Sequence, residues 1–354
     1  MSRTASNPAE AARVETVASD YSHTLPLILH RLGISALVST YQAGQLIVLR
    51  ADDEKTLSPL YRNLPQPMGI AVGRDLAIGT HHHIHEYRHH PAAARELDSG
   101  NRHDLVLMPS NSKLTGDIRI HEMVYQDQEL WFANTRFSCL ATIDRDHSFV
   151  PRWQPPFISR LAAEDRCHLN GIGMRDGRIA YVSALGATDT PNGWREHKAH
   201  GGILMAFPSG AIVASGLSMP HSPRWHENQL WFLESGKGSL ARLDAAGAVE
   251  TLIELPGFTR GLAFAGRYAF IGLSRVRETN AFGGIPLNTR VEEKRCGVAV
   301  VDVIARKQVG LLEFKTVVDE VFDVQLIRAR WPEVVDVESG LLATSYLLPS
   351  ASLR

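Results

Sequence analysis

The sequence has little cysteine and no cysteine motif. Its 354 residues include three cysteines, Cys139, Cys167 and Cys296, which lie far apart and form no CxxC pair. Zinc ribbons need paired thiolates, and small secreted proteins need several disulfides. The sequence therefore predicts neither of these, and it favours a chain that works in a reducing compartment.

Long hydrophobic runs and an excess of one charge are absent as well. No apolar stretch approaches the roughly eighteen residues that span a bilayer, and the first twenty residues lack the apolar core of a secretion signal. The formal net charge is −1 without a basic run, so neither nucleic acid nor a membrane is expected as a partner. We predict a soluble, cytoplasmic protein that acts on a small molecule.

Several common catalytic motifs are also missing. The sequence has no Walker-type glycine loop, no GxSxG and no HExxH. These motifs cradle phosphates, present a serine nucleophile or hold zinc on a helix. The sequence therefore argues against nucleotide-driven chemistry and against the common serine and zincin hydrolases.

What the sequence does contain is an internal repeat. Six segments each have a short apolar strand, a polar turn and a second apolar strand, and two more short strands usually follow. The segments begin at Pro67, Ile120, Leu169, Pro220, Thr259 and, in degenerate form, Val321. Four short strands recurring every 40–60 residues or so are typical of β-propeller blades. The apolar positions alternate with a period of two, which disfavours a helical solenoid.

The two ends of the chain predict how the ring closes. Little sequence follows the strand at Phe322, whereas three strands, starting at Ile34, Gln45 and Leu57, precede the first repeat. Joining one C-terminal strand to three N-terminal strands would remove an open sheet edge. We predict an all-β fold, a six-bladed β-propeller with 3+1 closure that spans residues 31–354, after an N-terminal lead-in over residues 1–30 that contains a short helix.

The repeats place six side chains at one mouth of the central channel, because the first strand of each blade lines that channel. These residues are Met68, His121, Asn170, His221, Arg260 and Phe322. Apolar residues would fill a purely structural channel at lower cost than histidine and arginine, whose desolvation must be compensated. The prolines on either side of His221 are expected to fix the direction of its imidazole.

Three further segments are expected near the same mouth. Residues 186–202 and 274–297 form loops longer than most, and such loops are usually functional or disordered. The histidine-rich segment that starts at Thr80 is predicted to be a loop at the equivalent place in the first blade. Its spacing fits a metal-binding loop and a solvated loop equally well.

Several long motifs resemble a known family. They are WFANTRFSCLATID, HLNGIGM, TDTPNGWRE, PHSPRWH, LESGKG and PGFTRGLAFAGRYAFIGLS. Together they resemble the bacterial family named domain of unknown function 4915, over roughly residues 117–325. The resemblance implies a propeller-like protein and brings no established activity.

A weaker resemblance concerns the segment LNGIGMRDG at Leu169, which is similar to the Asn-Gly turn of gluconolactonase and senescence-marker-type propellers. In those enzymes, acidic and Asn side chains at blade starts hold one divalent metal over a hydrolytic site, and Asn170 matches by position. His121 and His221 stand where those enzymes use carboxylates. The resemblance therefore implies a softer site, suited to Zn, Fe, Mn or Cu rather than Ca.

These observations lead to a set of expected roles. We expect His121, His168, Asn170 and His221 to hold the metal. Arg260 would bind an anionic group, Glu122 and Glu234 would move protons, and Arg136, Trp194 and Arg195 would contact the substrate. Each also has a structural interpretation, such as a turn residue for Asn170 or an inter-blade ion pair for Arg260.

Two functions follow from this site. The sequence favours a metal-dependent enzyme that hydrolyses a lactone or ester of a small polar metabolite, or catalyses a related isomerisation or cyclisation. The alternative is a non-catalytic propeller that binds a ligand or a partner protein through the same mouth, since propellers serve many functions.

Overall fold

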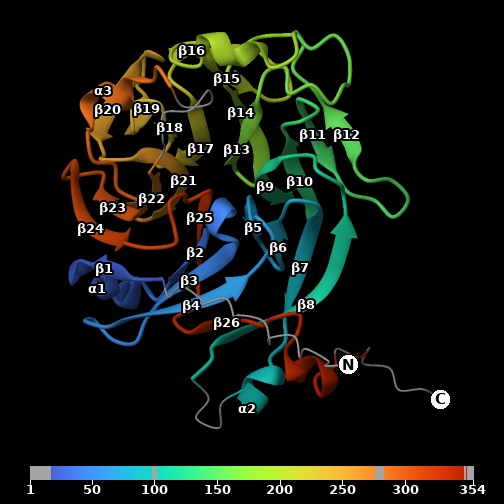
Figure 1. The fold of residues 1–354 in the computed structure, drawn as a ribbon, viewed down its shortest axis with the longest axis vertical. Helices are drawn as coiled ribbons and strands as arrows, with labels where there is room; N and C mark the ends of the chain where they lie inside the picture. The colour runs from blue at the N-terminus through green and yellow to red at the C-terminus, as the bar shows by residue number, and fades with distance from the viewer. Residues whose placement is uncertain (1–16, 98–101, 276–282, 347, 349–354) are drawn as a thin grey trace, which may run out of the picture.

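Six antiparallel sheets surround one central channel in the computed structural model (Figure 1). The structure describes residues 17–97, 102–275, 283–346 and 348. Blade 1 contains β5 (Ile70–Val72), β6 (Leu76–Gly79), β7 (His83–His89) and β8 (Leu105–Leu114). Blade 2 contains β9 (Ile120–Gln126), β10 (Glu129–Asn134), β11 (Cys139–Thr142) and β12 (Val150–Trp153). Blade 3 contains β13 (Leu169–Arg175), β14 (Arg178–Ala184), β15 (Gly202–Ala206) and β16 (Ile212–Leu217).

The other three blades complete the ring. Blade 4 contains β17 (Pro220–His226), β18 (Gln229–Glu234), β19 (Ser239–Leu243) and β20 (Val249–Glu254). Blade 5 contains β21 (Phe258–Ala265), β22 (Tyr268–Ser274), β23 (Gly297–Asp302) and β24 (Lys307–Phe314). Blade 6 contains β25 (Asp323–Ile327), β2 (Ser35–Ser39), β3 (Gln45–Ala51) and β4 (Leu57–Asn63). The predicted six-bladed propeller is confirmed.

The polar turns of the repeats are tight hairpins. Asp127 and Gln128 both have positive φ, as do Glu227 and Asn228 in the equivalent turn of blade 4. Two consecutive residues with positive φ make a type I′ turn, whose twist matches that of the strands it joins. Short polar residues tolerate this backbone conformation, so these turns set the register of the innermost hairpins.

Blade 6 closes the ring as the sequence predicts. Strand β25 pairs antiparallel with β2, with Val324 opposite Val38 and Ile327 opposite Ser35. The three N-terminal strands then follow in order from the channel outward, as β2, β3 and β4. One blade is thus built from both ends of the chain, which satisfies the inner edge of β2.

The lead-in is partly built into the propeller. Residues 1–16 lie outside the described part of the chain. Strand β1 (Ser19–Tyr21) adds a fifth strand to the outer edge of blade 5 by pairing with β24. Helix α1 (Thr24–Leu32) includes the expected boundary after residue 30, and its Leu25 and Leu29 pack into the core shared with Phe270 and Phe314.

Smaller elements decorate the rim. Strand β26 (Pro332–Val334) pairs parallel with β8. The remaining helices are α2 (Ala93–Leu97), α3 (Pro286–Arg290), η1 (Tyr41–Ala43), η2 (Gly193–His197) and η3 (Gly340–Ala343). The histidine-rich segment was wrongly expected to be a loop, because its second half forms strand β7, where it pairs with both β6 and β8.

The hydrophobic core lies between neighbouring blades. Phe132 and Met123 of blade 2, for example, pack with Ala71 and Ile84 of blade 1 in one buried cluster.

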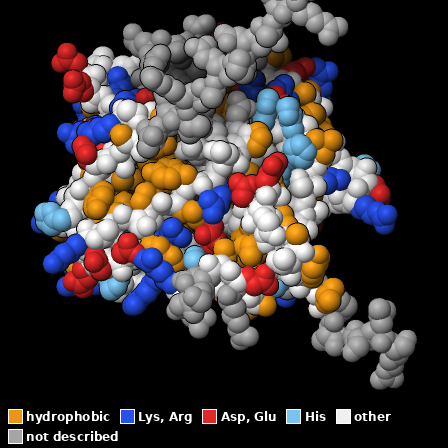
Figure 2. Space-filling model, turned by 60° about the horizontal axis from the view of Figure 1, so that its bottom comes forward, with side chains coloured by type: hydrophobic (Ala, Val, Ile, Leu, Met, Phe, Trp, Pro, Cys, Tyr) orange, Lys and Arg blue, Asp and Glu red, His pale blue; other side chains and the backbone are white. Residues whose placement is uncertain are grey.

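On the face shown in Figure 2, basic and acidic side chains are interspersed. Within the described residues, no helix is both long and apolar enough to cross a membrane.

Closure is expected to be essential for folding. Deleting residues 31–60 removes most of β2, β3 and β4, which exposes the inner edge of blade 6 and the apolar faces packed against it. The variant should show no cooperative thermal unfolding by circular dichroism. The control Ile304→Ser changes a side chain that is 66% exposed and should shift stability by no more than about 0.5 kcal/mol. A cooperative transition in the deletion variant would show that five blades are sufficient.

Candidate functional site

Two imidazoles at the channel mouth are held in the same way. Nδ1 of His121 lies 3.0 Å from the backbone O of Arg119 and 2.8 Å from Thr135 Oγ1. Nδ1 of His221 lies 3.0 Å from the O of Met219 and 2.9 Å from Ser235 Oγ. In both cases the carbonyl belongs to the residue two positions earlier and the hydroxyl to the residue fourteen positions later.

A repeated backbone feature produces this arrangement. Arg119 has a φ of 52° and Met219 a φ of 48°. Left-handed backbone is strained for such side chains and persists only where the surrounding structure enforces it. Here it turns the carbonyl toward the following imidazole. Gln66 and His168 have positive φ at the equivalent place in blades 1 and 3.

These hydrogen bonds fix the tautomer of both rings. A carbonyl oxygen can only accept, so Nδ1 must carry the proton in each neutral imidazole. Nε2 is then the atom with the free lone pair. Within the described residues, no hydrogen bond involves Nε2 of either ring. The two ring centroids are 6.5 Å apart and the planes are nearly parallel, at 18°.

The third group at the mouth is the Arg260 guanidinium. It lies 3.4 Å from the centroid of the Phe322 ring, and its Nη1 lies 3.3 Å from Glu320 Oε1. Burial lowers the pKa of Arg260 to about 10, and burial raises the pKa of Glu320. Arg260 therefore stays charged at neutral pH, which gives the mouth a positive centre.

Burial and the positive charge of Arg260 act together on the two histidines. Burial is the larger cause and Arg260 the second, and both lower the pKa of His121 and His221 well below the ordinary value. The two imidazoles are consequently uncharged at neutral pH. Each uncharged imidazole therefore presents an unprotonated Nε2, which can accept a hydrogen bond or a proton from a ligand.

The three groups face one cavity of about 200 Å³. Its lining includes Tyr41, Met68, Arg119, His121, Asp165, His168, Leu185, Trp194, Arg195, Met219, His221, Phe258, Arg260, Glu320 and Phe322. The loop after β14 supplies Trp194, which is 3% exposed, and Leu287 of α3 packs in the same apolar cluster. The first long loop therefore lines the mouth cavity and the second packs against its apolar lining, although residues 276–282 of the second lie outside the described part of the chain.

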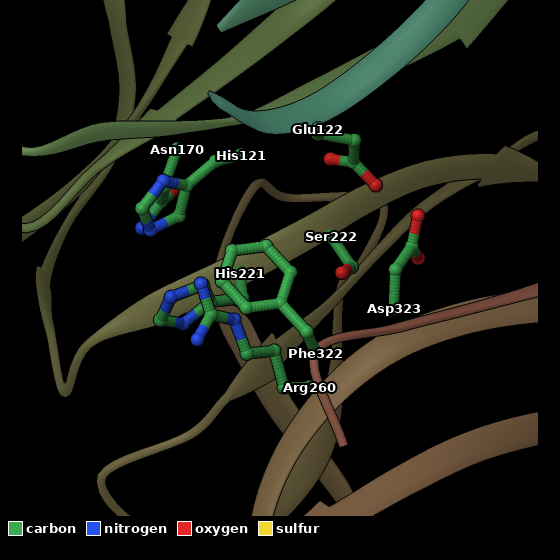
Figure 3. Close-up of a pocket in the computed structure, with 8 residues that line it drawn as sticks. All are labelled: His121, Glu122, Asn170, His221, Ser222, Arg260, Phe322 and Asp323. Atoms are coloured by element: carbon green, nitrogen blue, oxygen red, sulfur yellow. The ribbon is translucent and has the colours of Figure 1, made fainter. Parts of the chain in front are cut away.

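Phe322 divides the channel into two layers. In Figure 3, the imidazoles of His121 and His221 and the guanidinium of Arg260 lie on one side of the Phe322 ring, and Glu122, Ser222 and Asp323 lie on the other. We call the side with Glu122, Ser222 and Asp323 the inner layer and the other side the outer layer. A second cavity, of only about 10 Å³, is lined by residues of both layers, including His121, His221 and Arg260. The sequence placed Phe322 in the ring but gave no sign that its side chain would separate the two layers.

The carboxylates of the inner layer bind neighbouring blades. Glu122 Oε2 accepts from the N–H of Ile172 at 2.7 Å, and Asp323 Oδ2 accepts from the N–H of Ile70 at 2.9 Å. Glu122 also forms an ion pair with Arg224. A Cβ at Gly171 would lie 2.2 Å from Ser183 Oγ, so glycine is required where the Glu122 carboxylate comes close. Glu122 lies outside the lining of the larger cavity.

Other expected site residues are engaged elsewhere. Both polar atoms of the Asn170 amide are hydrogen-bonded. Nδ2 donates to the O of Pro220 at 3.0 Å, and Oδ1 accepts from Ser183 Oγ at 2.6 Å. Glu234 accepts from the N–H of Ser218 and pairs with Lys237, and Arg136 pairs with Asp117. None of these three belongs to the lining of the larger cavity.

His168 differs from the other two cavity histidines. Its Nδ1 lies 3.0 Å from both carboxylate oxygens of Asp165, which also pairs with Arg119 at 3.2 Å. Its ring lies 4.4 Å from that of Trp194 and 4.9 Å from that of His121, between centroids. A carboxylate that accepts from Nδ1 fixes the orientation of an imidazole.

The metal site expected at His121, His168, Asn170 and His221 stays a prediction. The described residues contain no group of three or more His, Cys, Asp or Glu side chains positioned to hold a metal ion. The Asn170 oxygen already accepts from Ser183. Arg260 is the charged group with the largest effect on the pKa of His121 and His221, and it favours an anion rather than a cation between them.

Sequence reasoning missed several cavity residues. They include Tyr41, Arg119, Asp165, Met219, Phe258 and Glu320. Arg119, Met219, Phe258 and Glu320 all stand two positions before a residue of the predicted ring. Extending the aligned repeat by two residues would have found these four, whereas Tyr41 and Asp165 come from loops that the repeat does not cover.

Removing Glu122 is expected to cost stability and not ligand binding. Glu122→Ala leaves Arg224 largely buried without its partner, which typically costs about 3–5 kcal/mol. The free energy of unfolding should be measured in urea. The control Glu250→Ala breaks part-exposed pairs with Arg242 and Arg306 and should cost much less, because solvent screens such pairs. Equal effects of the two substitutions would contradict the structural role of Glu122.

The two mouth histidines should make stability depend on pH. Because their pKa is lower in the folded chain than the unfolded value of about 6.5, only the unfolded chain takes up their protons as pH falls below that value. The free energy of unfolding should drop by up to about 1.4 kcal/mol per pH unit for each ring.

A double variant isolates this effect. His121→Asn with His221→Asn keeps a donor in the place of Nδ1 and removes the titrating ring, so its stability should change less between about pH 7 and pH 5. Burial raises the pKa of Glu122, Glu320 and Asp323, which acts with the opposite sign but equally in both proteins. Urea unfolding across this range gives the comparison, with the exposed His147→Asn as control. Parallel curves would refute the low pKa of the two rings.

Comparison with solved structures shows the propeller fold and little more. The chain in the nidogen–laminin complex gives a TM-score of 0.52 at 11% identity, covering 84% of this chain and 99% of that chain. A protein of unknown function from Bacteroides caccae gives 0.52 at 10% identity, with 83% and 99% covered. A Bacteroides fragilis NCTC 9343 protein provisionally described as a 6-phosphogluconolactonase gives 0.45 at 14% identity, with 83% and 98% covered.

Sequence comparison identifies the family. No curated protein matches the chain. The family model described as domain of unknown function (DUF4915) matches residues 23–335, which extends the motif resemblance at both ends. The chain belongs to the DUF4915 family.

Proposed function

We propose that the chain is an enzyme that binds a small anionic metabolite in the mouth cavity and catalyses an acid–base reaction on it. One observation carries this proposal. A buried guanidinium and two uncharged imidazoles, each with its Nδ1 fixed and its Nε2 free, belong to the same cavity. Perturbed titratable groups that converge on a concave site are typical of catalytic centres.

The charge of the cavity supports an anionic ligand. Three arginines line it, Arg119, Arg195 and Arg260, against the two carboxyl groups of Asp165 and Glu320. Burial raises the pKa of Glu320 and so weakens its negative charge. Arg260 is the most buried of the three cations and can form paired hydrogen bonds with a carboxylate.

The imidazoles supply the proton chemistry. One Nε2 can take a proton from a water molecule or from a carbon next to a carboxylate or carbonyl group. Arg260 can stabilise the negative charge that develops on the substrate oxygen. Ester or lactone hydrolysis and isomerisation of a small anion both need this combination. The ring centroids are 6.5 Å apart, and the imidazole that takes a proton at Nε2 becomes an imidazolium that can return the same proton to another atom of the ligand.

The matched substitutions His221→Asn and Arg260→Met separate catalysis from binding. His221→Asn keeps a donor toward the Met219 carbonyl and lacks Nε2, so hydrolysis of p-nitrophenyl acetate or δ-valerolactone should fall by about 10²–10⁴-fold. Acetate affinity should stay the same. Arg260→Met should weaken acetate binding by about tenfold or more, since it removes a charge-assisted hydrogen bond.

Controls and alternative outcomes are built into the same measurements. The control Arg242→Met removes an arginine that pairs with Glu250 on the outer part of blade 4 and should change neither reading. Activity that disappears with a chelator and returns with a divalent ion would establish metal dependence. Anion binding that depends on Arg260 without any turnover would favour a non-catalytic binding propeller. Absence of binding to acetate and phosphate would contradict the anion site.

A further inference from the structure

The mouth cavity has an apolar wall as well as a positive centre. Six of its lining side chains are apolar, namely Met68, Leu185, Trp194, Met219, Phe258 and Phe322. Four of them, Leu185, Trp194, Met219 and Phe258, belong to one buried cluster with Ile285 and Leu287. A ligand that only carried charge would leave this wall in contact with water.

The wall is fixed before any ligand binds. The loop that carries Trp194 is tied to the segment between β12 and β13 by the ion pair between Arg166 and Asp189 at 2.6 Å and by the hydrogen bond from the N–H of Asn192 to the O of Glu164 at 3.0 Å. Helix α3 is tied to blade 4 by the bond from the N–H of Leu287 to the O of Gly236 at 2.8 Å. A preformed wall of aromatic rings favours a rigid, flat group over a flexible chain.

The size of the cavity limits the ligand. An apolar cavity of about 150 Å³ accommodates benzene, and this cavity measures about 200 Å³. There is room for one six-membered ring with a short acidic substituent, and not for two rings. The ring of His221 also lies 5.9 Å from that of Phe258, so the apolar wall begins beside the imidazole.

We infer that the ligand is a carboxylate that carries a single planar ring, with the carboxylate at Arg260 and the ring against Trp194 and Phe258. This inference rests on the proposed anion site and adds the identity of the apolar part. A polyhydroxylated acid such as a sugar acid is disfavoured, because those of its hydroxyl groups that face the apolar wall would lack hydrogen-bond partners there.

Calorimetric titration of the full chain tests the inference with four probes: phenylacetate, acetate, gluconate and the uncharged phenylacetamide. Phenylacetate should bind at least about tenfold more tightly than each of the others, because it alone satisfies both the charge and the wall. Trp194→Leu and Phe258→Leu should each weaken phenylacetate binding by about threefold to tenfold and leave acetate binding unchanged. The control Trp225→Leu changes a ring that packs on Tyr181 outside the cavity and should have no effect.

The outcomes separate this inference from the proposed function. If acetate or gluconate binds as tightly as phenylacetate, and Arg260→Met weakens all three, the ring is wrong and the anion site stands. If phenylacetamide binds as tightly as phenylacetate, the cavity selects the ring alone, and the proposed anion site is wrong. Absence of binding by all four probes would overturn both. Melting curves identify any variant that fails to fold, and the second wall variant then gives the result.

Discussion

The pairing of β25 with β2 is the constraint on which the rest of the structure depends. It joins a strand near the C-terminus to a strand near the N-terminus, and so closes six blades around one channel. It also delivers Glu320, Phe322 and Asp323 to the channel. Without this pairing Arg260 would lose both Glu320 and the ring of Phe322, and the inner layer would lose the carboxylate that holds Ile70. The candidate site therefore exists only in the closed ring.

The polar groups of the channel fall into two sets: those that hold neighbouring blades together and those that a ligand in the cavity can contact. In the inner layer, Glu122 and Asp323 accept from backbone N–H groups of the next blade, and Arg224 donates to the carbonyl oxygens of Leu262 and Ile172. Buried charges persist where such partners compensate the loss of water. In the outer layer, Nε2 of His121 and of His221 has no partner among the described residues. A polar atom left free beside a cavity is the one that a ligand can use.

His221, the histidine between two prolines, has two roles that belong to different atoms of its ring. His221 is a structural residue through Nδ1, which donates to the carbonyl of Met219, and a candidate functional residue through Nε2. Its removal by alanine would therefore affect both stability and binding, since the Met219 carbonyl would keep only its bond from the N–H of Ser235 and the buried Ser235 hydroxyl would lose the imidazole. Asparagine separates the two roles, because it can reproduce the Nδ1 donor and cannot reproduce Nε2.

The sequence by itself determined the six repeats, the all-β fold, the 3+1 closure and part of the lining of the channel mouth, namely Met68, His121, His221, Arg260 and Phe322. These follow from local signals, because period-two alternation sets which side chains face inward and short polar turns mark each hairpin. Only the tertiary structure decided which of those residues keep a polar atom that a ligand can reach. Asn170 stands at the same repeat position as His121, and Glu122 directly follows that position. Their polar atoms are nevertheless hydrogen-bonded or ion-paired with Ser183, Pro220, Ile172 and Arg224. Those partners come from other strands or blades, and no local pattern encodes distances between residues so far apart in the chain.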